Sequence, residues 1–175
     1  MKIFDCTTFY NENLMLEVRF NILNDFVDKF VITESKYSHS GEKKRLNFDF
    51  KRFDKFKKKI IYLTVDNEPE DLVYEKKKEN VKFENEKNIR SNSIKRIAHQ
   101  RNNLSLGLNE AEDEDYIFYS DNDEIPDFAN FDFKNNKSKI IMFKQKLFYY
   151  KFNLYCDRVD WHGAKGCKKK IFKVI

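Results

Sequence analysis

The sequence predicts an α/β fold in which a mainly parallel central sheet is flanked by helices. The first observation is that strand-length apolar segments alternate with segments whose apolar residues recur at helical spacing. The second is size: 175 residues suit one domain of about 100–200 residues, and 41% hydrophobic residues are enough for a core. We therefore expect a single domain over residues 1–175.

The first half of the chain supplies three expected strands and one helix. Residues 2–6 are typical of a short strand, and residues 13–27 carry Leu16, Phe20, Leu23 and Val27 at helical spacing, with Asn13 as the expected N-cap. The compact apolar segments 29–34 and 60–65 are the next two strands.

The second half is less regular. Residues 67–87 are charged and weakly periodic, which indicates a loop with some helix, and residues 88–108 favour a longer helix that ends near Gly107. A fourth strand is expected at 115–120 and a last short one at 169–174, while 139–154 suits either one long strand or a hairpin.

The amino-acid composition argues against several classes of protein. The net charge of +5 rests on short lysine runs separated by apolar segments, and no nucleic-acid-binding motif accompanies it, so a nucleic-acid partner is not expected. Three cysteines without close spacing argue against a disulfide framework or a zinc site. The sequence shows no signal peptide and no apolar run of about 20 residues, so we expect no transmembrane segment and a cytoplasmic location.

The segment 115–126, DYIFYSDNDEIP, carries the most chemical information. An apolar strand ends there, and Asp121, Asp123 and Glu124 follow within four residues. Ligands of open α/β sheets bind at the carboxyl ends of strands, and clustered carboxylates there are typical of a hard divalent cation with oxygen ligands. The alternative is that these acids form a solvated turn or cap a helix.

The sequence also resembles glycosyltransferase family 17, typified by the enzyme that adds the bisecting N-acetylglucosamine to N-glycans. The matching blocks follow the family's order over nearly the whole chain. They are FDC at 4–6, FYNE at 9–12, LEVR at 16–19, DKFVITES at 28–35, SG at 40–41, QRN at 100–102, SDNDEIP at 120–126 and WHG at 161–163.

The resemblance implies a GT-A-like nucleotide-sugar-binding fold, a UDP-sugar donor, a glycan or other hydroxyl acceptor, and manganese or magnesium as the cofactor. It also implies transfer, for example of N-acetylglucosamine, with inversion at the anomeric carbon. The catalytic region of the family normally continues past the last expected strand, so we expect the chain to be incomplete at its C-terminus. The membrane anchor of the animal enzymes has no counterpart here.

Several residues receive roles on this basis. Asp121 and Asp123 are the expected metal ligands, and Glu124 orients a ligand or accepts a hydrogen bond from a sugar hydroxyl. Arg101 is expected to hold a phosphate, because guanidinium binds phosphate bidentately, although a salt bridge from helix to sheet is equally compatible. Glu34 and Ser35, at the end of a strand on the same edge, are expected to contact the nucleotide.

An inverting transfer needs a general base, for which Asp157 and Asp160 are candidates and Asp160 is preferred. Nearby, Trp161 could stack on a sugar ring, and His162 is a further acid/base candidate. Polar residues near the first expected helix are Glu12, Glu17 and Arg19.

Three alternatives stay open. A non-catalytic domain could bind a nucleotide sugar without turnover. A nucleotidyltransferase would also use an acidic pair, but the segment 9–14 lacks the expected Gly-rich or basic phosphate loop. A nucleic-acid-binding module would show affinity that falls steeply with salt.

Overall fold

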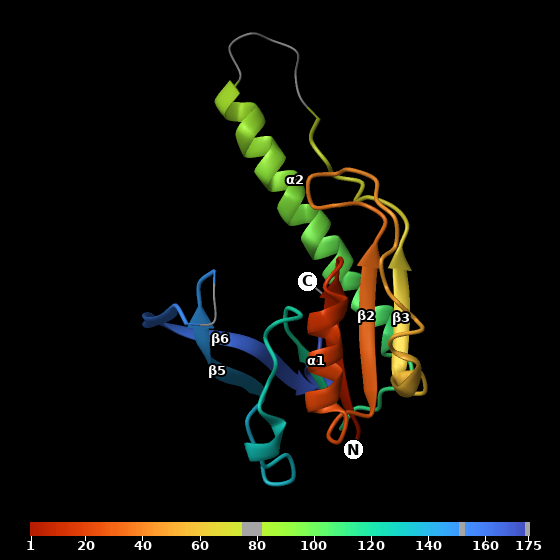
Figure 1. Ribbon diagram of the computed structural model, residues 1–175, viewed down its shortest axis with the longest axis vertical. Helices are drawn as coiled ribbons and strands as arrows, with labels where there is room; N and C mark the ends of the chain where they lie inside the picture. Colours follow the sequence, from red (N-terminus) through yellow and green to blue (C-terminus); the bar gives the residue numbers. More distant parts are fainter. Residues whose placement is uncertain (75–81, 151–152, 174–175) are drawn as a thin grey trace.

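A computed structural model describes residues 1–74, 82–150 and 153–173, and it has a six-stranded mixed sheet with two α-helices (Figure 1). The chain order is β1 (Ile3–Phe9), α1 (Asn13–Leu23), β2 (Lys29–Ser35), β3 (Ile60–Val65), α2 (Lys82–Asn102), β4 (Tyr116–Tyr119), β5 (Ile140–Phe148) and β6 (Tyr155–Lys168). Short 3₁₀ turns occur at Asp54–Phe56, Asn103–Gly107, Phe128–Asn130 and Lys169–Ile171. The α/β class is therefore confirmed.

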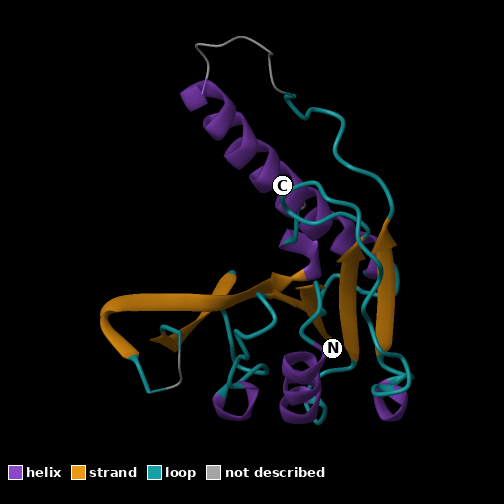
Figure 2. Cartoon of the chain, turned by 45° about the horizontal axis from the view of Figure 1, so that its top comes forward, coloured by secondary structure: helices purple, strands orange, loops and turns teal. Residues whose placement is uncertain are grey.

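The strand order is β3-β2-β1-β4-β6-β5. Strand β1 pairs parallel to both β2 and β4, and β2 pairs parallel to β3. Strand β6 pairs antiparallel to both β4 and β5, and together β5 and β6 form a long ribbon that extends away from the parallel strands (Figure 2). Because three strands end at the same edge, the residues after β1, β2 and β4 are brought together there.

The two faces of the sheet are covered differently. Helix α1 packs Leu16, Phe20 and Leu23 on one face, where they join a buried cluster with Phe30 and Phe118. On the other face, the 3₁₀ turn after α2 inserts Leu104 against Phe4, Cys6 and Val31. The alternation of β1 decides this arrangement, because successive side chains of a strand point to opposite faces.

The observed ends of both helices differ from the ends expected from the sequence. Helix α1 ends at Leu23 instead of residue 27, because the amides of Phe26 and Val27 both bond to the Leu23 carbonyl and turn the chain. Helix α2 begins at residue 82 and gives way to 3₁₀ geometry at 103–107, earlier at both ends than the expected 88–108. Of the expected loop at 67–87, residues 75–81 lie outside the described residues.

The prediction of a last strand at 169–174 was wrong where the structure describes it. Residues Lys169–Ile171 form a 3₁₀ turn, and the strand that pairs with β4 is β6. Residues 139–154 hold β5, the first strand of a hairpin whose second strand begins at Tyr155. Most of β6 is exposed on both faces, so it lacks the apolar alternation that marks a half-buried strand. Within the described chain, no helix is both long and apolar enough to cross a bilayer.

Candidate functional site

A cavity of about 460 Å³ opens at the carboxyl ends of β1 and β4. We call it the donor-side cavity, after the nucleotide-sugar donor that the sequence resemblance implies. Five parts of the chain line it: the end of β1 with the segment after it, helix α1, the loop after β2, the end of α2, and the loop after β4. Its lining residues are Thr8, Phe9, Tyr10, Glu12, Met15, His39, Ile97, Gln100, Arg101, Asp121, Asn122 and Asp123. The structure therefore places three of the expected site residues, Arg101, Asp121 and Asp123, in the lining of one cavity.

The Asp121 carboxylate is held from two directions. Its Oδ1 accepts a hydrogen bond from Arg101 Nη2 at 3.0 Å and another from the Tyr119 hydroxyl at 3.0 Å. The Arg101 guanidinium also lies over the Tyr119 ring, 5.2 Å from its centroid. Burial, followed by the charge of Asp121, raises the pKa of Tyr119, so its hydroxyl stays a donor at neutral pH.

Arg19 anchors the loop that carries the acids. Its side chain is fully buried and pairs bidentately with Asp5, with Nε to Oδ2 at 2.7 Å and Nη2 to Oδ1 at 2.6 Å. Its remaining N–H groups donate to Ser120 Oγ at 2.7 Å and to the Asp121 carbonyl at 3.0 Å. Longer hydrogen bonds, of 3.4 and 3.3 Å, reach the carbonyls of Asn122 and Glu124. The position of the loop is therefore set by a charge buried beneath it.

A second cavity, of about 360 Å³, lies on the other side of the same loop. We call it the ribbon-side cavity. It shares Met15, Asp121 and Asp123 with the donor-side cavity, and adds Glu124 and residues of the β5–β6 ribbon. The Glu124 carboxylate accepts from the Trp161 indole at 2.8 Å and from the Asp121 amide at 3.2 Å. Glu124 and Trp161, which the sequence marked separately, are thus in direct contact.

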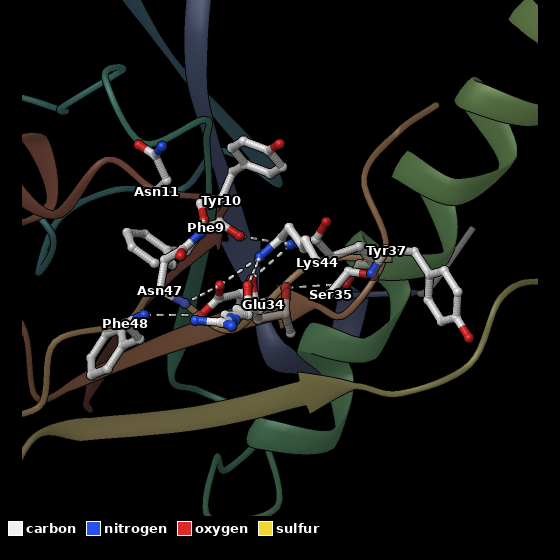
Figure 3. A network of polar contacts seen from close by, with 12 residues as sticks. Phe9, Tyr10, Asn11, Glu34, Ser35, Tyr37, Lys44, Asn47 and Phe48 are labelled. Carbon is white, nitrogen blue, oxygen red and sulfur yellow. Dashed lines mark hydrogen bonds and ion pairs between the residues drawn. The ribbon is translucent and has the colours of Figure 1, made fainter. Parts of the chain in front are cut away.

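Glu34 and Ser35, which the sequence predicts to contact the nucleotide, lie at the end of β2 and make hydrogen bonds within the protein. The Glu34 carboxylate is fully buried and accepts hydrogen bonds from Lys44 at 2.6 Å and from the amides of Asn47 and Phe48 (Figure 3). It also accepts one from the Tyr62 hydroxyl at 2.8 Å. Ser35 Oγ accepts from the Tyr37 amide at 3.0 Å. Neither residue lines either cavity, and Glu34 ties the loop after β2 to the sheet.

The candidate bases on β6 are exposed. Asp160 forms an ion pair with Lys144 at 2.5 Å, and that hydrogen bond lowers the pKa of the Asp160 carboxyl. His162 Nδ1 lies 3.2 Å from the Asp160 carbonyl. Asp157, Asp160 and His162 are absent from the linings of both cavities.

His39 and Asn122 also line the donor-side cavity, although neither was assigned a role from the sequence. His39 lies on its wall, where desolvation and then the charge of Arg101 lower the pKa of the imidazole. Asn122 is buried, and neither polar atom of its side chain has a hydrogen-bond partner. Buried polar groups without partners are rare in proteins, so Asn122 marks a place where a ligand or water would complete the site. Its position between the two aspartates was the available signal.

The site suits a divalent cation with few protein ligands. Within the described residues, no three His, Cys, Asp or Glu side chains are grouped so that they could hold a metal. Asp121 and Asp123 offer carboxylate oxygens to one cavity, and magnesium or manganese accepts such a set when water and phosphate oxygens complete its coordination. The unpartnered Asn122 amide beside them fits the same interpretation.

Comparison with known protein families settles the relationship. The sequence model of glycosyltransferase family 17 matches residues 1–171. The chain belongs to glycosyltransferase family 17. This glycosyltransferase therefore acts with a sugar donor and a glycan acceptor, in agreement with the resemblance seen in its motifs. No curated protein and no solved structure matches the chain.

Proposed function

We propose that this family 17 glycosyltransferase transfers a sugar from a UDP sugar to a glycan hydroxyl in a reaction that requires magnesium or manganese. The observation that carries the proposal is the donor-side cavity, which Asp121, Asp123 and Arg101 line together at the carboxyl ends of parallel strands and where Arg101 pairs with Asp121. A GT-A-like site for a nucleotide diphosphate needs this arrangement, in which an acidic pair and the positively charged Arg101 lie at the edge of a sheet. The family precedent favours N-acetylglucosamine and inversion.

Each residue has a task that follows from its position. A bound divalent cation would supply Lewis-acid stabilisation of the charge that grows on the departing diphosphate. Asp121 and Asp123 would hold that cation. Arg101 already donates to Asp121, and since a guanidinium has five N–H donors, others can reach a phosphate oxygen.

Glu124 is our choice for the group that accepts a hydrogen bond from the acceptor hydroxyl. Its carboxylate lines a cavity that also contains the acidic pair. Asp160, the base favoured by sequence, is instead ion-paired with Lys144 outside both cavities. The geometry therefore favours Glu124 over Asp160.

Thermal unfolding with UDP and manganese tests the proposal. Ligands that bind only the native state stabilise it by about 2.7 kcal/mol at 100 times their Kd. We expect a manganese-dependent rise in Tm with UDP for the wild type, and loss of most of it in Asp121→Asn and Asp123→Asn. Asp127→Asn is the matched control, because this exposed aspartate follows the same loop but lines neither cavity. Equal manganese shifts in all four proteins would refute the metal assignment.

Two further measurements separate the alternatives. Arg101→Ala should weaken UDP binding more than it lowers stability, because the residue is largely exposed and its ion pair contributes little to folding. Hydrolysis of a UDP sugar, measured beside UDP binding, distinguishes an enzyme from a domain that only binds. Release of pyrophosphate from a nucleoside triphosphate would instead indicate a nucleotidyltransferase.

A further inference from the structure

The ribbon-side cavity has its own set of walls. One wall is the acidic loop, and the other comes from the β5–β6 ribbon, which projects beside α1 in Figure 1. The ribbon contributes Gln145, Lys146, Leu147, Phe148 and Trp161. Because Asp121 and Asp123 line both cavities, a molecule in this one would lie against the same acidic pair as a donor.

Trp161 is held in a fixed orientation with part of its ring accessible. Its indole N–H donates to Glu124 Oε1 at 2.8 Å, while the residue stays 39% exposed. Phe148, on the neighbouring strand, is 40% exposed. Exposed aromatic rings beside a carboxylate match a pyranose, whose C–H faces are apolar and whose rim carries hydroxyl groups.

The polar groups around the Trp161 ring are held by hydrogen bonds within the protein. Gln145 donates to the Ile125 carbonyl at 2.8 Å and accepts from the Ala164 amide at 3.1 Å, which joins the ribbon to the acidic loop. Each Glu124 oxygen accepts one bond within the protein, and a carboxylate oxygen can accept a second. Glu124 can therefore receive a sugar hydroxyl without losing its own contacts.

Gly163 shows how closely the ribbon approaches this carboxylate. A Cβ at residue 163 would lie 2.0 Å from Gln145 Oε1 and 2.9 Å from the Glu124 carboxyl carbon. A side chain there would displace both groups, because such separations are far shorter than van der Waals contact. The β5–β6 ribbon therefore packs directly against the Glu124 carboxylate at this cavity.

We propose that the ribbon-side cavity is the acceptor subsite and binds a hexopyranoside, with its ring on Trp161 and a hydroxyl on Glu124. The proposal rests on the proposed function, since it assigns the second substrate of the same reaction. It explains why the two cavities share the acidic pair: the acceptor hydroxyl and the donor sugar must meet between them. It also assigns a function to the exposed β5–β6 ribbon, which is to bind the acceptor sugar.

Intrinsic fluorescence tests the subsite directly, because Trp161 is the only tryptophan in the chain. The wild type is titrated with N,N′-diacetylchitobiose, methyl α-mannoside and methyl β-galactoside, and with sorbitol as an acyclic polyol control. Magnesium replaces manganese here, since manganese quenches fluorescence. We expect a saturable change with at least one glycoside, at a Kd of about 1 mM, and none with sorbitol. If no glycoside differs from sorbitol, the proposal is overturned.

Variants locate the binding. Saturation-transfer NMR should show at least a tenfold loss of glycoside affinity in Trp161→Leu and no change in Tyr150→Leu. Tyr150 is a matched control because it belongs to the same hairpin, is 98% exposed and does not line the cavity. Equal affinity in both variants would overturn the assignment. The wild-type titration decides the matter if Trp161→Leu fails to fold.

Failure of the subsite can be told from failure of the proposed function. UDP affinity with magnesium, measured by calorimetry, should fall far less than glycoside affinity in Trp161→Leu, because the residue does not line the donor-side cavity. UDP binding without any glycoside response refutes the subsite alone. A glycoside response without UDP binding refutes the proposed donor and leaves the subsite standing.

Discussion

Replacing Arg19 with methionine should destabilise the protein and disorganise the acidic loop. Arg19 and Asp5 are 0% and 1% exposed, so the substitution leaves Asp5 as a buried charge without its partner. Removing one member of a buried pair costs about 3–5 kcal/mol. For a domain of this size, where 1 kcal/mol shifts Tm by about 2–4 °C, the expected fall in Tm is about 6–20 °C.

The double variant Asp5→Leu/Arg19→Met separates stability from loop position. Apolar replacement of a whole buried ion pair is often neutral or stabilising, so most of the lost free energy of unfolding should return. UDP affinity in magnesium should not return, because the carbonyls of Asp121 and Glu124 lose the guanidinium that holds them. Urea denaturation measures the stability, and calorimetry measures UDP affinity.

Arg52→Met is the matched control. Arg52 also pairs with a carboxylate, through Nε at 2.7 Å and Nη2 at 2.6 Å to the single oxygen Oε2 of Glu17. Both of these side chains are about one third exposed, so the expected cost is at most about 1 kcal/mol. The reasoning would be refuted if Arg19→Met cost no more than this control. It would also be refuted if the double variant regained UDP affinity together with stability.

Three further changes have defined outcomes. Glu34→Gln should lower the free energy of unfolding by about 1–3 kcal/mol, because a buried carboxylate with four partners is altered, while weakening UDP binding less than Arg101→Ala does. Two lysine partners lower the pKa of Glu114 from 4.5 to about 2. The stability that this carboxylate contributes is therefore complete above about pH 4.5 and is lost as the pH falls toward 2. In Glu114→Gln, the free energy of unfolding measured with urea should depend less on pH in that window. Gly166→Ala should destabilise by about 1–3 kcal/mol or more, because its Cβ would lie 2.2 Å from the buried Phe118 ring.

Each of these has a contradicting result. A Glu34 variant that loses UDP affinity without losing stability would return that residue to the nucleotide site. Glu114 is fully exposed, so its effect should shrink in high salt, and a salt-independent effect would contradict a surface ion pair. Unchanged stability in Gly166→Ala would show that β6 can move away from the core.

The parallel strands could be predicted because each is a short apolar run, and β1, β2 and β4 are largely buried. Segments 29–34 and 60–65 are short apolar runs bounded by polar residues, and the structure has strands at Lys29–Ser35 and Ile60–Val65. The placement of Asp121 and Asp123 followed from the same logic, since residues after a buried strand must emerge at a sheet edge. Local sequence therefore determined the α/β class and the position of the acidic loop.

Only the tertiary structure shows the contacts of Glu34, Arg19 and β6. Glu34 stands at a strand end like a ligand, but residues 10 to 14 positions later fold back onto its carboxylate. Arg19 gave no sign of contacts with a loop more than 100 residues away. Strand β6 is held by its neighbours β4 and β5 although most of it is exposed, so its own residues carry no burial pattern. Periodicity reports which side chains are buried, whereas the partners of a charge depend on chain crossings that no local pattern encodes.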